Sequence, residues 1–235
     1  MPAQTPIRLA LIGAGIFARD MHVPALAALG DLFRITAVYS RTLANAEALA
    51  ATLPTPAIAC DDLDAVLARD DVEAVNIVLP IPQLPDAVRR ALDAGKHVIS
   101  EKPVAPDVAT GRALLAHYAG RADRVWMVGE NYRYEPTYVR AAEIVASGAI
   151  GRPGVAVWSL QIDMTPANKY YHTAWRRSNT FPGGFLLDGG VHHAAALRLI
   201  IGEIASVSAI ASVIRGDLPP WDTLQAALAF EGGVS

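Results

Sequence analysis

The sequence predicts an α/β protein with two domains: an N-terminal doubly wound parallel sheet over residues 1–124, and an α+β domain with a mainly antiparallel sheet over residues 125–235. Two observations predict this division. In the first half, short apolar runs alternate with helical patterns, which is typical of βαβ units. After about residue 122, the strand-like segments become longer and fewer helices separate them, which favours antiparallel pairing.

The first half contains four strand-like runs that are continuously apolar or rich in β-branched and aromatic residues. They cover residues 7–13, 33–40, 74–80 and 97–103. Helical patterns alternate with these runs, at residues 23–30, 43–53, 84–95 and 107–120. Gly95 suits a helix C-terminus, and Asp107 suits the N-cap of the last of these helices.

The second half begins with an expected strand at residues 124–134 and a helix at residues 136–148. Further strands are expected at residues 154–163, 205–214 and 223–230. Between them, residues 164–187 form a long segment rich in polar and aromatic residues, and loops of that length are usually functional. The chain ends directly after a strand, which would leave an open sheet edge, so we expect the second domain to be incomplete.

The composition narrows the function classes. Of 235 residues, 52% are hydrophobic and 18% are charged, as in a globular protein with a well-filled core. The net charge of −3 comes without a basic stripe, so we expect no nucleic-acid partner. No apolar run is long enough for a membrane span. The single cysteine, Cys60, is expected in the core and suits a reducing, cytoplasmic compartment.

A glycine-rich turn follows the first expected strand. Gly13, Gly15 and Ala18 form a Gly-x-Gly-x-x-Ala pattern that opens a helix. The first glycine makes the turn, the second lets the backbone approach a pyrophosphate, and the alanine allows close packing of helix on strand. The helix N-terminus would add amide donors. The pattern predicts a Rossmann dinucleotide site that includes Ile16 and Phe17, although a glycine-rich turn without a ligand is the alternative.

The end of the second strand indicates which cofactor binds. An acidic residue there would accept hydrogen bonds from the ribose 2′-hydroxyl of NAD. The sequence instead has Ser40 and Arg41, with no acid. A hydroxyl and a guanidinium suit a 2′-phosphate. We therefore favour NADP(H), keep NAD(H) as possible, and note that Arg41 as a solvated residue before a helix is the alternative.

Lys102 stands directly after the apolar strand in "HVISEKPVAP", residues 97–106. The chain has only three lysines, Lys96, Lys102 and Lys169. In open α/β sheets, ligands bind beyond the carboxyl ends of the strands, so Lys102 is expected to point into the cofactor crevice. The alternative is a surface lysine whose stem covers apolar neighbours.

Several further stretches resemble the glucose–fructose oxidoreductase, inositol dehydrogenase and rhizopine-catabolism (Gfo/Idh/MocA) oxidoreductases along nearly the whole chain. These are "GAGIFARDMHVPAL", "AGKHVISEKPVA", "NYRYEP", "SGAIGRPG", "AWRR" and "GGFLLDGGVHH". The resemblance implies that Lys102 lies beside the nicotinamide and the substrate, and that the peptide before Pro103 is cis. It also implies oligomerisation through the second sheet, so a homo-oligomer is expected if that sheet is complete.

The stretch "PGGFLLDGGVHH" resembles a family block in which an Asp and a His are functional, which implies Asp188 and His192 here; Pro182 replaces the first of three glycines. If a helix begins near Gly189, the two side chains lie on one face, so that the carboxylate can tune the imidazole. His193 would point elsewhere. The residues alone fit a structural or metal-binding pair as well as a catalytic one; with the resemblance, we expect no metal.

The resemblance implies alcohol oxidation and, in reverse, ketone reduction, on a sugar, cyclitol or related polyol. His192 would take the hydroxyl proton as general base. Asp188 would orient the imidazole or relay the proton, and Lys102 would stabilise the developing alkoxide. The hydride transfer itself is the chemistry of the cofactor.

Other contacts are expected from the same resemblance. The remaining cofactor contacts are Leu79, Pro80, Glu101 and Asn131. The loop after the third of the four strand-like runs lacks the family's usual His, and Gln83 is a weak substitute for its Asn. Substrate contacts are expected from aromatic and polar loop residues that can stack on sugars and bind hydroxyls: Tyr132, Arg133, Tyr134, His172, Trp175, Arg176 and Asn179. For "NYRYEP", ordinary domain packing is an equal alternative.

Two other functions remain open at this point. The fold is also used by regulators that bind a dinucleotide without turnover, and the missing loop His and the "PGG" variation keep that alternative. Reduction of a double bond or pigment by a related enzyme is a third, less favoured because such proteins need not keep the Asp and His pair. The presence of Lys102, Asp188 and His192 favours an oxidoreductase acting on CH–OH groups.

Overall fold

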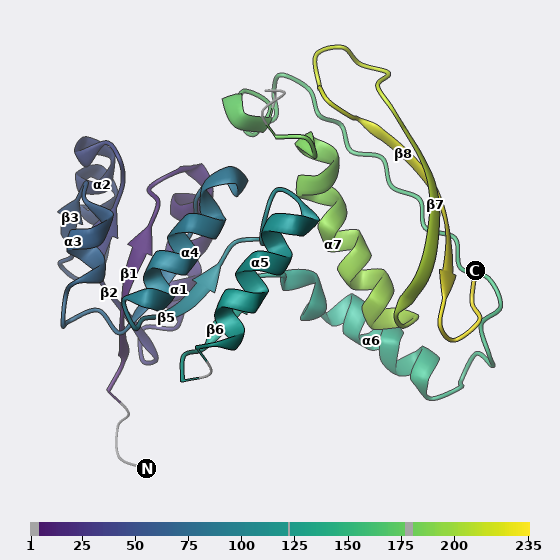
Figure 1. Ribbon diagram of the computed structural model, residues 1–235, viewed down its shortest axis with the longest axis horizontal. Coiled ribbons are helices and arrows are strands. Elements are labelled where there is room, and N and C mark those ends of the chain that lie inside the picture. Colours follow the sequence, from purple (N-terminus) through teal and green to yellow (C-terminus); the bar gives the residue numbers. More distant parts are fainter. Residues whose placement is uncertain (1–4, 122, 177–180) are drawn as a thin grey trace. The chain divides into compact units, whose positions relative to one another are not determined.

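A computed structural model describes residues 5–121, 123–176 and 181–235 of the chain. The chain divides into two compact units, Met1–Gly129 and Glu130–Ser235. In Figure 1 the first unit runs from purple to teal and the second from teal-green to yellow.

The first unit is built on one six-stranded sheet in the order β3-β2-β1-β4-β5-β6. Every neighbouring pair is parallel. The strands are β1 (Ile7–Ile12), β2 (Phe33–Tyr39), β3 (Ile58–Cys60), β4 (Ala74–Ile77), β5 (His97–Ser100) and β6 (Trp126–Val128). The chain runs outward from β1 to β3 and then returns to β4 on the other side of β1. This confirms the predicted doubly wound parallel sheet and creates a topological switch point between β1 and β4.

Helices cover the sheet on both faces. They are the π-helix η1 (Ala18–His22), α1 (Val23–Ala28), α2 (Leu43–Ala50), α3 (Leu63–Leu67), the 3-10 turn η2 (Ile81–Gln83), α4 (Leu84–Asp93) and α5 (Val108–Ala119). Alternate residues of β1 pack into two separate hydrophobic cores, because successive side chains of a strand point to opposite faces of the sheet. Ala10 and Ile12 join the cluster under α3, α4 and α5. Leu9 and Leu11 join the cluster under α1 and α2.

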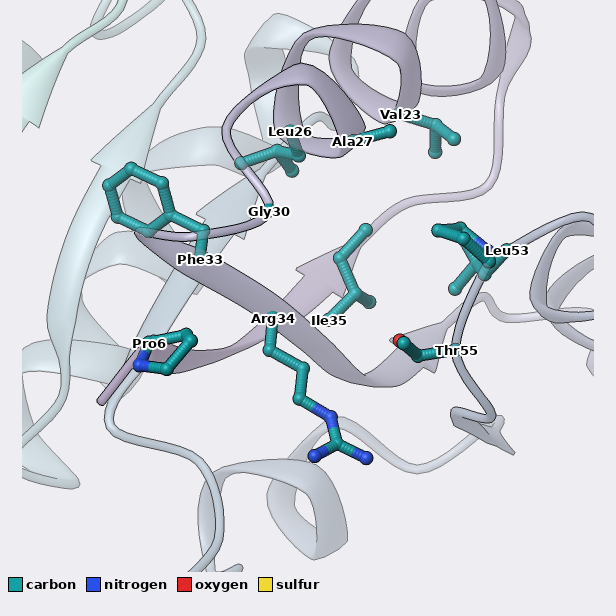
Figure 2. A pocket seen from close by; sticks show the side chains of 11 residues that line it. Pro6, Val23, Leu26, Ala27, Gly30, Phe33, Arg34, Ile35, Leu53 and Thr55 are labelled. Atoms are coloured by element: carbon teal, nitrogen blue, oxygen red, sulfur yellow. The ribbon is translucent and has the colours of Figure 1, made fainter. Parts of the chain in front are cut away.

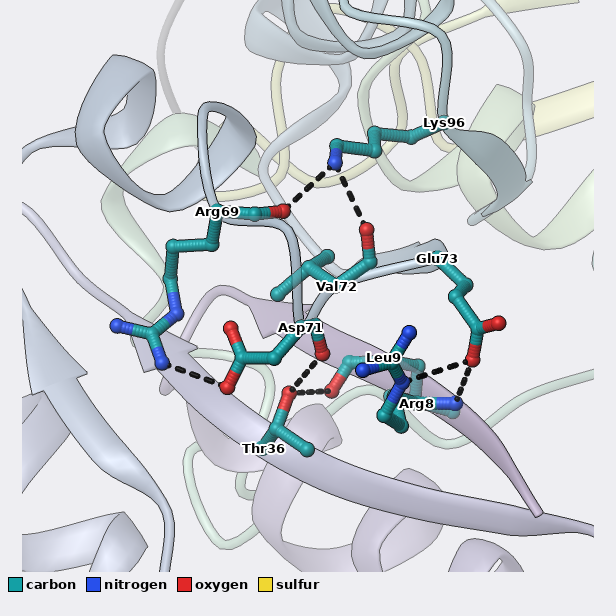
Figure 3. Close-up of polar contacts among 8 residues, drawn as sticks. All are labelled: Arg8, Leu9, Thr36, Arg69, Asp71, Val72, Glu73 and Lys96. Carbon is teal, nitrogen blue, oxygen red and sulfur yellow. Dashed lines mark hydrogen bonds and ion pairs between the residues drawn. The ribbon is translucent and has the colours of Figure 1, made fainter. Parts of the chain in front are cut away.

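At the edge of the sheet where the strands begin, an ion pair and hydrogen bonds from a lysine connect neighbouring segments (Figure 3). Arg8 Nε donates to Glu73 Oε2 at 3.1 Å, which ties β1 to the residue before β4. Lys96 Nζ donates to the carbonyl oxygens of Arg69 and Val72, each at 2.8 Å. This lysine therefore satisfies backbone acceptors before β4 and has a structural role.

The second unit contains η3 (Asn131–Arg133), α6 (Pro136–Ala146), η4 (Ala174–Arg176), α7 (Gly184–Ile200), β7 (Ile204–Ser212) and β8 (Thr223–Phe230). The strands β7 and β8 pair antiparallel, as predicted, and α6 packs against α7. Figure 1 shows β7 and β8 as a long twisted ribbon.

Three expectations about element boundaries differ from the structure. Residues 154–163 are not a strand: their backbone hydrogen bonds within the described residues join only Gly154 and Ala156 to Ser235. The helix expected near Gly189 begins at Gly184, and the strand expected over residues 124–134 covers only Trp126–Val128. The short elements β3 and α3 were not predicted at all. Within the described residues, no helix is both long and apolar enough to span a membrane.

Candidate active site

The glycine-rich turn lies directly after β1, at the carboxyl edge of the sheet. Gly13 has φ 115°, and a Cβ atom there would lie 2.2 Å from the carbonyl oxygen of Val78. Only glycine fits this position. Gly15 is exposed, and no heavy atom lies within 4 Å of the Cβ that it lacks. Its backbone is therefore accessible to a ligand, in front of the helix that begins at Ala18.

Other predicted cofactor contacts follow the neighbouring strands. Ser40 and Arg41 come directly after β2; Ser40 is half-buried and Arg41 is exposed. Leu79 and Pro80 follow β4 and are half-buried, as is Phe17 after the glycine turn, whereas Ile16 is exposed. Because the strands are parallel, all these residues lie at the same edge of the sheet.

Glu101 and Lys102 follow β5 at this same edge. Lys102 is half-buried and is joined to the buried Pro103 by a cis peptide bond, as the resemblance implied. Glu101 accepts a hydrogen bond from a histidine that the sequence analysis did not single out: His22 Nε2 lies 2.8 Å from Glu101 Oε1. The position of Glu101 is thereby fixed by the last residue of η1, the helix that the glycine turn opens.

The ring of His22 is held through both nitrogens. Its Nδ1 lies 2.9 Å from the side-chain nitrogen Nδ2 of Asn76, which is 3% exposed in the middle of β4. An amide nitrogen can only donate, so His22 Nδ1 accepts and Nε2 carries the proton given to Glu101. Phe17 packs edge-on against the ring at 5.3 Å between centroids. This network ties the glycine turn to the loop that carries Lys102.

The second unit holds a second histidine–carboxylate pair. His192, on α7, places Nδ1 2.6 Å from Glu130 Oε1. Glu130 is 7% exposed and caps η3, accepting from the backbone N–H of Tyr132 at 3.0 Å. The Tyr132 ring stacks on the His192 ring, with 4.6 Å between centroids and 21° between planes. The ring of His192 is therefore oriented by a hydrogen bond to Glu130 and by stacking on Tyr132.

Asp188, expected to tune His192, makes an ion pair with Arg176. Arg176 Nε donates to Asp188 Oδ2 at 2.7 Å, and both side chains are 15% exposed. The Arg176 guanidinium also lies over the rings of Trp175 and Tyr170, at 4.3 and 5.2 Å from their centroids. The carboxylate that contacts Nδ1 of His192 is therefore that of Glu130, and a catalytic role for Asp188 stays a prediction.

The remaining predicted contacts that the structure describes lie in η3 and in turns of the second unit. Asn131, Arg133, Tyr134 and His172 are exposed. Asn131 Nδ2 donates to Glu135 at 3.4 Å, and His172 Nε2 donates to the carbonyl oxygen of Pro166 at 3.1 Å. Exposure leaves these side chains accessible to a ligand. Asn179 lies outside the described residues.

An apolar cavity of about 250 Å³ lies elsewhere in the first unit (Figure 2). It is formed between α1, the beginning of β2 and the segment after α2. Its lining includes Val23, Leu26, Phe33, Ile35 and Leu53. None of the predicted site residues lines it, because they follow the carboxyl ends of the strands.

Three residues of the two networks were missed by sequence reasoning: His22, Asn76 and Glu130. The sequence carried a signal for each of them. His22 stands inside the quoted stretch "GAGIFARDMHVPAL", and Glu130 directly precedes "NYRYEP". Asn76 interrupts an apolar strand with a polar side chain, and a buried polar residue needs a partner.

Comparisons with known proteins agree with both units. The model of the "Oxidoreductase family, NAD-binding Rossmann fold" matches residues 7–130. The model of the "GFO/IDH/MocA C-terminal domain" matches residues 138–235. A solved oxidoreductase from Thermotoga maritima is 42% identical, with a TM-score of 0.94, and the match covers 97% of this chain and 70% of that one.

Named relatives are dehydrogenases and reductases. A dehydrogenase of Fusarium mangiferae is 37% identical over 95% of this chain and 67% of its own length. The inositol 2-dehydrogenase of Rhodococcus erythropolis is 31% identical over 87% of this chain, which spans 56% of that protein. A solved 3-ketoreductase from Actinomadura kijaniata, in complex with TDP-benzene and NADP, is 29% identical with a TM-score of 0.76, covering 97% of this chain and 67% of its own.

The matched models together cover most of the chain, and their order along it is the order of the two units. The chain belongs to the GFO/IDH/MocA family of oxidoreductases, with the family's NAD-binding Rossmann fold in its first unit and the family's C-terminal domain in its second.

Proposed function

We propose that the chain is part of an NADP(H)-linked oxidoreductase that interconverts a hydroxyl and a keto group on a sugar, cyclitol or related polyol. The observation that carries this proposal is the glycine turn at the switch point of the sheet. Gly13 is sterically required there, and Gly15 leaves its backbone open to a ligand. Family membership and the sugar-related names of relatives, such as inositol 2-dehydrogenase, support the substrate class.

The residues at this edge fit a dinucleotide. Amide groups at the start of the helix after Gly15 would bind the pyrophosphate, because a helix N-terminus attracts anions. When bound, the nicotinamide would supply hydride transfer. Lys102 and the exposed backbone of Gly15 both follow strands of the same sheet edge, where a dinucleotide binds in doubly wound folds.

The preference for NADP(H) rests on Arg41. It is exposed directly after β2, where the ribose 2′ position lies in this type of site. Its guanidinium would pair with a 2′-phosphate by charge-assisted hydrogen bonds. Ser40 would add a hydroxyl donor beside it. No acidic residue occupies positions 39–42, so the ribose diol of NAD would lack its usual acceptor.

The proposed chemistry gives a role to Lys102, to His192 and to three exposed side chains. Lys102 would donate hydrogen bonds to the substrate oxygen and stabilise the charge that develops there. His192 would take the hydroxyl proton during oxidation and return it during reduction. Arg133, Tyr134 and His172, which are exposed, would bind the substrate hydroxyls.

Absorbance at 340 nm tests the proposal directly. The chain is assayed with NADP⁺ against a panel of cyclitols, aldoses and sugar acids, and with NADPH against keto-sugars. We expect turnover with at least one polyol. Lys102→Ala should abolish that turnover while NADPH affinity stays within about tenfold, because the lysine would act on the substrate oxygen. Loss of NADPH binding in this variant would contradict the role given to Lys102.

A further inference from the structure

We propose that Glu130 is a positioning residue that holds the proton of His192 on Nδ1 and so leaves Nε2 as the basic nitrogen of the ring. This inference rests on the proposed role of His192 as the general base. It assigns to Glu130 the task that sequence reasoning gave to Asp188.

The tautomer follows from the contact between the two side chains. His192 Nδ1 and Glu130 Oε1 are 2.6 Å apart. An ionised carboxylate can only accept hydrogen bonds, so the proton between them belongs to Nδ1. A neutral imidazole carries one N–H, which leaves the lone pair on Nε2. The short contact is typical of a charge-assisted hydrogen bond.

The acceptor oxygen is itself fixed. The same Oε1 atom accepts from the backbone N–H of Tyr132 at 3.0 Å, because Glu130 caps the 3-10 turn η3. The Tyr132 ring stacks on His192 and lies 5.0 Å from the Tyr138 ring of α6. Rotation of the imidazole would therefore break a short hydrogen bond and a ring stack together.

The charge of Glu130 would also assist the reaction. During oxidation the substrate C–H bond breaks with hydride transfer to the cofactor, and the O–H bond gives its electron pair to the new C=O bond. The released proton goes to Nε2 of His192, and the ring becomes an imidazolium. A carboxylate at 2.6 Å stabilises that cation, and more strongly in a buried site than in water.

The adjacent His193 lies on the same helix, α7, but its ring is not oriented by a carboxylate of the described residues. Its Nδ1 is buried and has no hydrogen-bond partner among the described residues. Burial lowers the pKa of His193, and the neighbouring His192 lowers it further. His193 therefore lacks the orienting carboxylate that His192 has, although both rings contact Tyr132.

Nitrogen-15 NMR of the histidine rings tests the tautomer without any substrate. We expect Nδ1–H for His192 in the wild-type chain. His172 serves as an internal reference of the opposite kind, because its Nε2 donates to a carbonyl oxygen. Glu130→Leu should shift His192 toward Nε2–H and leave His172 unchanged. An Nε2–H tautomer of His192 in the wild-type chain would overturn the proposal.

A second variant separates the charge from the hydrogen bond. In Glu130→Gln the amide oxygen can still accept from Nδ1–H, so the tautomer should persist while the negative charge is lost. We expect kcat to fall about 10- to 100-fold with KM within about twofold. The control is Glu143→Gln, which removes an exposed carboxylate paired with Arg140 on α6 and should leave kcat unchanged.

The outcomes distinguish this inference from the proposed function. An unchanged kcat in Glu130→Gln would show that the pair is structural and would overturn the proposal. If the wild-type chain has the expected tautomer but no turnover with any polyol, the proposed substrate class fails, while the positioning of His192 by Glu130 stands. Should Glu130→Leu fail to fold, the wild-type spectrum and the Gln variant still decide between these outcomes.

Discussion

Each unit of the chain contains a histidine paired with a glutamate, and the two pairs hold opposite tautomers. In the first unit, His22 gives its Nε2 proton to Glu101 and accepts from Asn76 at Nδ1. In the second unit, His192 gives its Nδ1 proton to Glu130. Both ring nitrogens of His22 have hydrogen-bond partners, whereas for His192 the described residues supply a partner at Nδ1 alone.

The difference shows how similar contacts serve different purposes. A ring bound on both sides cannot exchange a proton with a substrate, so His22 acts as a crosslink between η1, β4 and the loop after β5. A ring bound on one side is oriented yet still basic, which is what a general base requires. The comparison therefore predicts that changes at His22 affect stability most, and changes at His192 affect the rate most.

The largest effect is expected at His192. His192→Asn removes the proposed base, and kcat should fall about 1,000-fold, the middle of the range for lost acid–base catalysis. The melting temperature should fall less than in His22→Leu, because Glu130 Oε1 keeps the backbone N–H of Tyr132 as a donor. Steady-state kinetics at 340 nm and thermal melting measure both quantities. A variant that keeps full activity would refute the role of His192.

A large loss of stability is expected at His22. His22→Leu leaves the Glu101 carboxylate and the Asn76 amide without their histidine partner in a site where Asn76 is 3% exposed, and this should cost about 2–4 kcal/mol of unfolding free energy. Urea denaturation measures it. The control is His117→Leu, which loses one contact with the half-exposed Asp93 and should cost less than about 1 kcal/mol. Equal losses of unfolding free energy in the two variants would contradict the structural role given to His22.

A smaller effect is expected at a local contact that belongs to neither pair. Asp107 caps α5 by accepting from the backbone N–H of Thr110 at 2.8 Å. Asp107→Ala should lower the free energy of unfolding by about 1 kcal/mol, the usual cost of a lost N-cap. Denaturant titration at neutral pH provides the measurement. NADPH affinity should stay as in the wild type, and a large loss of affinity would show that α5 affects the cofactor site.

The smallest effect is a change in acid sensitivity. Two hydrogen bonds lower the pKa of Asp217 from 3.8 to about 2. The larger effect comes from the Arg215 guanidinium and the smaller one from the Tyr171 hydroxyl. Because the folded-state pKa is depressed, the carboxylate stabilises the fold above pH 3.8, and this contribution is lost as the pH falls toward 2. The melting temperature of Asp217→Asn should therefore fall less steeply over this interval. Parallel melting curves for both proteins would contradict the prediction.

The sequence predicted the parts of the fold that have long or repeated patterns. The alternation of apolar runs and helices identified the parallel sheet. By contrast, β3 has three residues and α3 has five, which is too short for a period to appear. Residues 154–163 show the alternation of a strand, but a strand also needs a hydrogen-bonding partner, and sequence alone does not supply one.

Some features of the candidate site could likewise be predicted from the sequence, and others could not. The glycine turn was predictable because steric demand acts within a few residues of Gly13. The pairing of His192 with Glu130 joins positions 62 apart, and no local spacing reveals it. The four-residue spacing of Asp188 and His192 suggested a helical pair, but Arg176 takes the aspartate. Features that depend on a few neighbouring residues could be predicted from the sequence. Which side chains pair with each other depends on tertiary packing and could not.

We propose that the carboxyl edge of the parallel sheet binds NADP(H). The most direct test is a titration of the chain and of Arg41→Ala with NADPH and with NADH, followed by nicotinamide fluorescence and melting temperature. We expect NADPH to bind and raise the melting temperature, and Arg41→Ala to weaken NADPH far more than NADH, because only NADPH carries the 2′-phosphate. Binding of neither nucleotide, or equal weakening of both, would contradict the claim.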